Sequence, residues 1–278
     1  MMKDESSSYS GLEENIFSKD PKKGPSHRFW SGLLLLVFIG LIYLVKDPLV
    51  GFLGSSLRIL SKYSEYFIKG LKYTLGLSII SVFFGSILGT LLYFLRSSKV
   101  VVLKKFSLIF IELIRGTPLI TQLSIVFFGS ALILDFKSLG LDLAMTAFVC
   151  GIIAVSINSG AYISEIIRSG IQSVPKGQME AGRSLGLSHR MTMREIILPQ
   201  AIRNILPALG NEFIALTKET AIVSSIGVMD IMYNVNVVRG SSFKPMEPLM
   251  IAAVMYFVLT FGLSKLVNLL ERRLKTHD

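Results

Sequence analysis

The apolar residues of the chain fall into six long blocks separated by polar stretches. The first block, Phe29–Val45, holds 17 residues without a charge. As a helix it would be about 25 Å long, just enough to cross the hydrocarbon layer of a membrane. The other five blocks are roughly Tyr66–Leu95, Phe106–Leu134, Leu143–Ile167, Leu209–Ile226 and Leu249–Leu270. This pattern predicts an all-α, polytopic membrane protein with about six transmembrane helices.

The first block is flanked by two segments of different character. Residues 1–28 are rich in Ser, Lys, Asp and Glu, which predicts a polar tail. Lys46-Asp47-Pro48 follows the block where a signal peptide would have small residues at a cleavage site, so we interpret residues 29–45 as a retained helix. Residues 46–65 mix apolar and charged residues at helical spacing, which predicts a segment along the outer membrane interface.

The basic residues fix the predicted orientation. Six spans place both termini on one side, together with residues 96–105 and 168–208. That side carries 18 Lys and Arg, whereas the opposite side carries 6. Because cytoplasmic loops are enriched in Lys and Arg, both termini, including a short tail at 273–278, are predicted to be cytoplasmic. The net charge of +10 follows this topology, so we expect no nucleic-acid partner.

Composition excludes several classes of protein. Only 17% of the residues are charged, against roughly 25% in soluble domains, so an ordinary soluble enzyme is excluded. The single cysteine, Cys150, and three scattered histidines predict no metal site. The chain has no catalytic triad pattern and no phosphate-binding G-x-x-x-x-G-K-[ST] motif, so we predict a non-catalytic chain without a cofactor of its own.

The cytoplasmic stretch 168–208 is too long for a bare connector. Pro175 and Gly177 predict a turn, and the next residues, 178–185, suit a short helix that ends at Gly186. Ser188 is a suitable cap for a second short helix. We expect Pro199 and Pro207 to interrupt the return to the membrane.

A motif in this stretch carries a family resemblance. Glu180-Ala181-Gly182 is followed at fixed spacing by Gly186 and by Ile196-Ile197-Leu198-Pro199. These residues resemble the Glu-Ala-Ala loop of ABC importer permeases, with Gly182 where that family usually has Ala. The segments IELIRGTPLITQL, INSGAYISEIIRSGIQSVPKGQMEAGRSLG, LPQAIRNILPALGNEFIALTKETAIVSSIG and FKPMEPLMIAA are similar to those of polar amino acid permeases of the histidine, glutamine and arginine type.

The resemblance implies a five-helix permease core over residues 66–272, preceded by one additional span. It implies a bacterial inner membrane protein whose 178–199 loop couples to a separate ATPase, which would hold the ATP and Mg. It also implies an extracytoplasmic solute-binding protein and a second permease chain, either a copy or a paralogue. The coupling residues would be Glu180, Ala181, Gly182, Gly186, Ile196, Leu198 and Pro199.

Polar residues within spans are costly in lipid and are typical of a substrate pathway. The third block is interrupted at Gly116-Thr117-Pro118, and polar residues of three blocks share helix faces. The predicted pathway residues are Thr117, Thr121, Gln122, Asn158, Tyr162, Glu165, Asn211 and Lys218. Two alternatives stay open: these groups bind one another in helix packing, and Glu165 pairs with Arg168 at the inner rim.

Two other classes of membrane protein are alternatives to this interpretation. An ion-coupled secondary amino acid transporter also uses broken helices and polar groups at the midplane. Six spans are few for that class, and an ordered cytoplasmic projection has no role in it. A membrane-bound enzyme would need a converging acid, base, metal or nucleophile, which the sequence does not offer.

Overall fold

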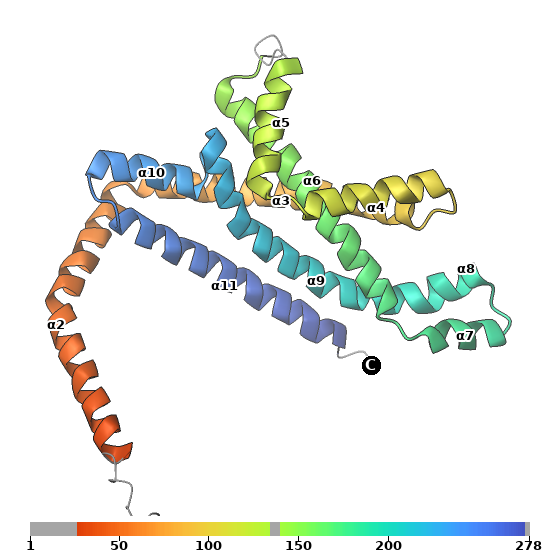
Figure 1. The fold of residues 1–278 in the computed structure, drawn as a ribbon, viewed down its shortest axis with the longest axis horizontal. Coiled ribbons are helices and arrows are strands. Elements are labelled where there is room, and N and C mark those ends of the chain that lie inside the picture. The colour runs from red at the N-terminus through yellow and green to blue at the C-terminus, as the bar shows by residue number, and fades with distance from the viewer. Residues whose placement is uncertain (1–26, 134–139, 276–278) are drawn as a thin grey trace, which may run out of the picture. The chain divides into compact units, whose positions relative to one another are not determined.

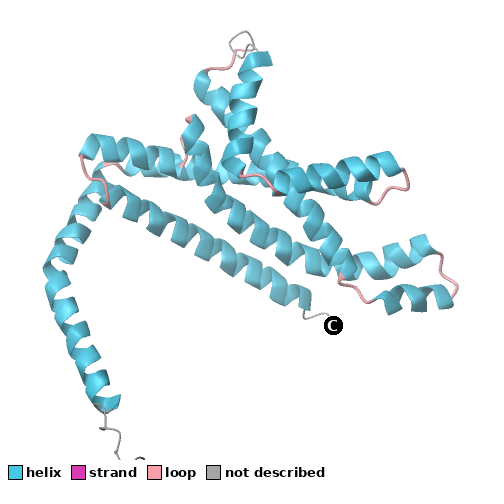
Figure 2. Cartoon of the chain, in the orientation of Figure 1, coloured by secondary structure: helices cyan, strands magenta, loops and turns pink. Residues whose placement is uncertain are grey.

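The computed structural model describes residues 27–133 and 140–275, and every regular element in these ranges is helical (Figure 2). The all-α class is therefore confirmed. The elements are α2 His27–Lys62, α3 Ser64–Arg96, α4 Val101–Arg115, α5 Leu119–Ile133, α6 Leu143–Gln172, α7 Lys176–Ser184, α8 His189–Thr192, a π-helical turn η1 Met193–Ile197, α9 Leu198–Glu219, a 3₁₀ helix η2 Thr220–Ile226, α10 Ile231–Ser242 and α11 Glu247–Lys275. Most of the two predicted tails, residues 1–26 and 276–278, lies outside the described residues.

The chain divides into two compact units, Met1–Gly54 and Ser55–Asp278. The backbone of 29–45 is helical, but many of its side chains lie outside the described residues, so this span stays a prediction. The predicted interfacial segment 46–65 is also almost entirely helical, because α2 continues through Pro48 to Lys62.

In the second unit, α3, α6 and α11 are each long and apolar enough to cross a membrane. Two further candidates are bent pairs of helices. The axes of α4 and α5 differ by 106°, and the helical run 189–226 differs from α10 by 53°. The described residues thus hold three candidate spans, or up to five if each bent pair counts as one, and the count of six stays a prediction.

The break between α4 and α5 falls at Gly116-Thr117-Pro118, as the sequence predicted. The expected interruption at Pro199 and Pro207 was wrong, because α9 runs unbroken through both residues. Pro199 lies in the first turn of α9, where a proline costs little, since its missing N–H would have had no partner in that helix. The irregular backbone lies just before it instead, in the π-helical turn η1.

The centre of the second unit is the contact between α3 and α6 (Figure 1). Small residues line this contact on both helices. A Cβ atom added at Gly89 would lie 2.7 Å from the carbonyl oxygen of Gly160, and one added at Gly160 would lie 2.9 Å from Cδ2 of Leu88, so glycine at both positions lets the two helices approach this closely. Such small-residue contacts are typical of helix pairs in membranes. An apolar cluster of Leu77, Leu123, Ala154 and Val223 joins α5 and η2 to this pair.

Candidate functional site

The segment between α6 and α9 folds into a helical hairpin that projects from the ends of these two helices (Figure 1). Its first helix, α7, ends in a glycine turn. Gly186 has a φ of +82°, its N–H donates to the carbonyl of Arg183 at 3.0 Å, and the Leu187 N–H donates to the carbonyl of Gly182 at 3.1 Å. This pair of bonds requires a left-handed residue, which glycine adopts without strain. The predicted helix end at Gly186 is confirmed.

The return helix starts where the sequence predicted. The Oγ atom of Ser188 accepts the N–H of Met191 at 3.3 Å and caps α8. Helix α7 begins at Lys176, so Gly177 belongs to the first helical turn of α7 and not to the connecting turn that the sequence predicted. The hairpin proper is residues 173–197, because 168–172 belong to α6 and 198–208 to α9. The two short helices predicted for this stretch are therefore present, within a projection shorter than residues 168–208.

Gly182, the departure from the family motif, has a structural reason. It is buried on the inner face of α7, and an added Cβ atom would lie 2.6 Å from Cγ2 of Thr192 and 3.1 Å from Cδ1 of Ile196. The Thr192 hydroxyl donates to the Ser188 carbonyl at 3.1 Å, which holds this side chain in place. Glycine at 182 thus lets the two arms of the hairpin touch.

The seven predicted coupling residues divide between two faces. The exposed ones are Glu180, Ala181, Gly186 and Pro199, whereas Gly182 is buried and Ile196 and Leu198 are half-buried. Ile197 closes the base of the hairpin together with Val174 and Ala201. Leu185 is 81% exposed at the tip. The motif therefore supplies an outer surface for contact and an inner surface that fixes the hairpin to α9.

Several predicted pathway residues contact one another at the break between α4 and α5. The Gln122 side-chain amide donates to the carbonyl of Ile114 at 2.7 Å and lies 2.9 Å from the Thr117 hydroxyl oxygen. Its Oε1 atom accepts from Asn158 Nδ2 at 3.0 Å. Gln122 and Asn158 are both buried. These bonds tie the broken helix to α6, as the helix-packing alternative predicted.

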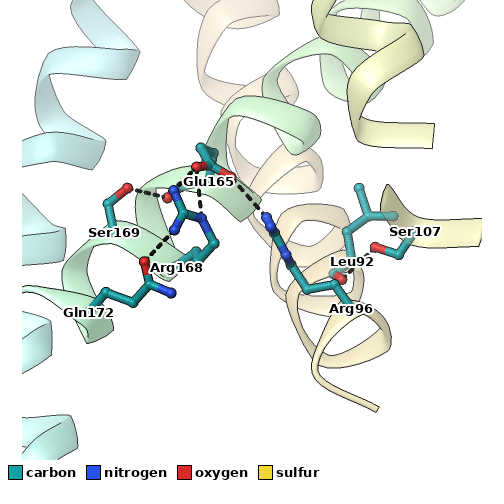
Figure 3. A network of polar contacts seen from close by, with 7 residues as sticks. All are labelled: Leu92, Arg96, Ser107, Glu165, Arg168, Ser169 and Gln172. Atoms are coloured by element: carbon teal, nitrogen blue, oxygen red, sulfur yellow. Dashed lines mark hydrogen bonds and ion pairs between the residues drawn. The ribbon is translucent and has the colours of Figure 1, made fainter. Parts of the chain in front are cut away.

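Glu165 stands at the centre of a second polar cluster (Figure 3). Its Oε2 atom accepts from Arg96 at 2.8 Å, and its Oε1 atom accepts from Nε of Arg168 at 2.8 Å. Arg168 also bonds to Gln172. Because Arg96 is the last residue of α3, this carboxylate joins the end of α3 to α6. The predicted pair of Glu165 with Arg168 is present in the structure.

A pocket of about 570 Å³ lies beside this cluster. Its lining residues come from α4, α6, the residue that directly follows α6, and α9: Arg115, Tyr162, Glu165, Ile166, Ser169, Gly170, Ser173, Asn204, Ala208 and Glu212. The Arg115 guanidinium lies 5.4 Å from the centre of the Tyr162 ring. The Asn204 amide donates to the Ser173 hydroxyl at 2.8 Å, which links α9 to the end of α6.

Glu212 and Arg115 line the pocket although neither is among the predicted pathway residues. The cost of a polar group in a span, which singled out Asn211 and Lys218, applies equally to Glu212. Asn211 and Lys218 are exposed residues of α9 that do not line the pocket, and Thr121 is also exposed outside it. Glu212 forms no ion pair with another described residue, unlike Glu165.

The chain has sequence relatives that are named as amino acid transport permeases. The chain is 40% identical over 209 residues to a protein named "Putative glutamine transport system permease protein GlnP" from Rickettsia bellii (strain RML369-C), covering 75% of this chain and 93% of the relative. It is 38% identical over 213 residues to the "Arginine transport system permease protein ArtQ" of Bacillus subtilis (strain 168), covering 77% of this chain and 94% of the relative.

Two solved structures have a similar fold. A chain of an amino acid ABC transporter, crystallised with histidines, superimposes with a TM-score of 0.71 at 44% identity and covers 77% of this chain and 96% of its own. A chain of the MetNI methionine ABC transporter in an inward-facing conformation has a TM-score of 0.56 at 19% identity, covering 74% and 97%. The second likeness concerns the fold alone.

The helical bundle, the projecting hairpin and the broken helix define the membrane-spanning subunit of an ABC importer. The family model described as "Binding-protein-dependent transport system inner membrane component" matches residues 81–276, and the chain belongs to this family. Its relatives are transport permeases rather than enzymes, in agreement with the predicted non-catalytic role.

Proposed function

We propose that this chain forms the translocation pathway for a polar amino acid and that the polar pocket between α4, α6 and α9 is part of that pathway. The observation that carries the proposal is the presence of both signs of charge on the pocket wall. The basic residue Arg115 belongs to α4, and the acidic residue Glu212 belongs to α9. An amino acid carries a carboxylate and an ammonium group, so a pocket with both signs of charge suits it.

The two glutamates of the pocket have different roles in this proposal. Both carboxylate oxygens of Glu165 already accept hydrogen bonds from arginines. Glu212 has no such partner among the described residues, so it is the acid that can meet a substrate ammonium group. The volume of about 570 Å³ lies within the usual range for small-molecule sites. The relatives named for glutamine and arginine transport support the same substrate class.

The energy would come from a separate ATPase that binds ATP and Mg and contacts the α7–α8 hairpin. The exposed face of α7 around Glu180 and Ala181 offers the contact surface. Because α6 passes the pocket and ends directly before the hairpin, movement of the hairpin would reach Glu165 and Ser169 along one helix. A solute-binding protein would deliver the substrate, and a second permease chain, identical or related, would complete the channel.

We place the protein in the bacterial inner membrane with both termini in the cytoplasm, in agreement with the positive-inside distribution of Lys and Arg. In this orientation the hairpin faces the ATPase. The predicted pathway roles of Thr117, Gln122 and Asn158 become indirect, since these residues hold the broken helix that carries Arg115.

The test is uptake of labelled amino acids into proteoliposomes that contain this chain, its ATPase and its binding protein. We expect accumulation that requires ATP, and a raised KM for the Glu212→Gln variant. Glu65→Gln, an exposed acid at the start of α3, is the matched control and should transport normally. An unchanged KM in Glu212→Gln would remove the pocket from the pathway. Uptake driven by an ion gradient without ATP would instead identify a secondary carrier.

A further inference from the structure

The end of the α3–α4 connection and the first turns of α4 together have an unusual surface. All eight residues from Lys99 to Phe106 are exposed, and four of them, Val100 to Leu103, form an unbroken apolar run. Val102 is 74% exposed. The start of a helix in water normally presents polar residues, so an exposed apolar run of this kind indicates a surface that something covers.

Exposed apolar stripes on both α3 and α4 continue into this region. On α4, the residues Val102, Phe106, Ile109 and Leu113 follow one another at helical spacing on the face opposite the buried Ser107 and Ile111. On α3, the residues Ile87, Leu91 and Phe94 do the same. In a membrane-spanning chain, such outward apolar stripes face lipid. Their continuity with the turn places the turn at the edge of the same lipid phase.

The charges around the apolar run have one sign. Lys99, Lys104 and Lys105 flank it, no acidic residue lies between 97 and 111, and none of the three lysines forms an ion pair with another described residue. Lysine side chains beside an apolar surface extend their ammonium groups to the headgroup level while their methylene stems stay in the apolar region. Figure 1 draws this turn and the α7–α8 hairpin toward the same edge of the view, the side that the basic residues predict to be cytoplasmic.

We propose that residues 99–106, the basic turn, bind anionic phospholipid headgroups of the cytoplasmic leaflet, with Val100–Leu103 inserted at the boundary of the acyl region. Positive charge without acidic neighbours favours an anionic headgroup over a zwitterionic one. The adjoining residue Arg96 is bound to Glu165, so a lipid held at the basic turn lies directly beside the helix end that is tied to the pocket wall. The proposal goes beyond the transport function and depends on neither the substrate nor the ATPase.

The test uses a local fluorescent reporter. The chain has one tryptophan, Trp30, so Trp30→Phe combined with Val101→Trp places a single indole in the basic turn. The full-length variant is reconstituted into bilayers that contain brominated phosphatidylglycerol or brominated phosphatidylcholine. We expect phosphatidylglycerol to quench this reporter more strongly by about twofold or more, because several lysines act together. Val102→Trp provides an independent reporter should the first variant fold poorly.

Three controls make the outcome decisive. Replacing Lys99, Lys104 and Lys105 by Gln should make quenching by the two lipids equal, whereas replacing all three by Arg should keep the preference. A reporter at Phe257, which is 66% exposed in the middle of α11, should show no preference. Equal quenching in the chain with native lysines overturns the proposal. So does a reporter that neither lipid quenches, since the basic turn would then be covered by protein, either the ATPase or a second permease chain.

Discussion

Replacing Glu165 by Gln should weaken the attachment of α3 to α6 more than any other exchange of a single charged side chain on the pocket wall. The carboxylate accepts from Arg96 at 2.8 Å and from Arg168 at 2.8 Å. The side chains of Arg96 and Glu165 are only 17% and 23% exposed. A glutamine keeps the shape of the side chain and one acceptor oxygen but removes the charge that both arginines share.

The magnitude follows from this intermediate burial. Exposed pairs contribute about 0 to 1 kcal/mol, whereas breaking a fully buried pair costs about 3 to 5 kcal/mol. For two charge-assisted bonds at this exposure, we expect Glu165→Gln to lower the free energy of unfolding by about 2 kcal/mol. That corresponds to roughly a thirtyfold change in the unfolding equilibrium constant.

A double-mutant cycle measures the pair directly. The free energy of unfolding in detergent micelles is compared for Arg96→Gln, Glu165→Gln, the double variant and the unmodified chain. We expect a coupling energy of about 1 kcal/mol or more. The pair of Arg194 and Glu195, 3.4 Å apart with side chains 84% and 64% exposed, is the matched control and should give a coupling near zero. Equal coupling in the two cycles would refute the argument from burial.

Three further predictions concern the hairpin and the broken helix. Gly182→Ala should destabilise the hairpin by about 1 kcal/mol net, because the clash with Thr192 outweighs the gain in helix propensity. In thermal unfolding, the double variant Gly182→Ala/Thr192→Ser should recover the lost stability. Failure to recover it would exclude this contact as the cause. Gly186→Val should reduce transport far more than Gly186→Asn at equal membrane insertion. The position has room for a side chain but requires a left-handed backbone conformation, which Asn adopts more readily than Val. Equal vesicle uptake by the two variants would contradict this. Gln122→Leu should lower the free energy of unfolding by about 1 to 3 kcal/mol, because the buried Asn158 amide and the Ile114 carbonyl lose their shared partner. A changed substrate selectivity in uptake assays, with the free energy of unfolding unchanged, would instead assign Gln122 to the substrate pathway.

Local signals in the sequence predicted the local structure well. The glycine at 186, the cap at Ser188 and the break at Gly116-Thr117-Pro118 each depend on the backbone preferences of a few neighbouring residues. Pro207 was misjudged because a proline in a helix can be tolerated where tertiary packing supports the helix. The neighbouring Ala201 and Ile205 are buried against α6 and the hairpin base, which is a contact that no local pattern contains.

The composition of the pocket could not be predicted in the same way. Whether a polar residue in a span lines a cavity or binds a neighbour depends on the partner that another helix supplies. Gln122 and Asn158 are in contact although they are 36 positions apart, and Arg96 meets Glu165 across 69 positions. Helix periodicity places residues on a face of one helix but does not say which helix that face meets. For this reason the sequence left both roles of Glu165 open, and the structure shows the ion pair with Arg168.

The arrangement of these contacts suggests how the hairpin and the pocket act as one mechanical element. α6 is continuous from the buried Asn158, past Glu165 and Ser169 on the pocket wall, to Gln172 before the hairpin. The hairpin is fixed at its other end by Ile197 against Ala201 of α9, and Glu212 of α9 lines the same pocket. In the proposed mechanism, a displacement of the hairpin would therefore act on the pocket through both α6 and α9. Because the Asn204–Ser173 bond links α9 to the residue after α6, it is a contact that would break or re-form if these two walls separated.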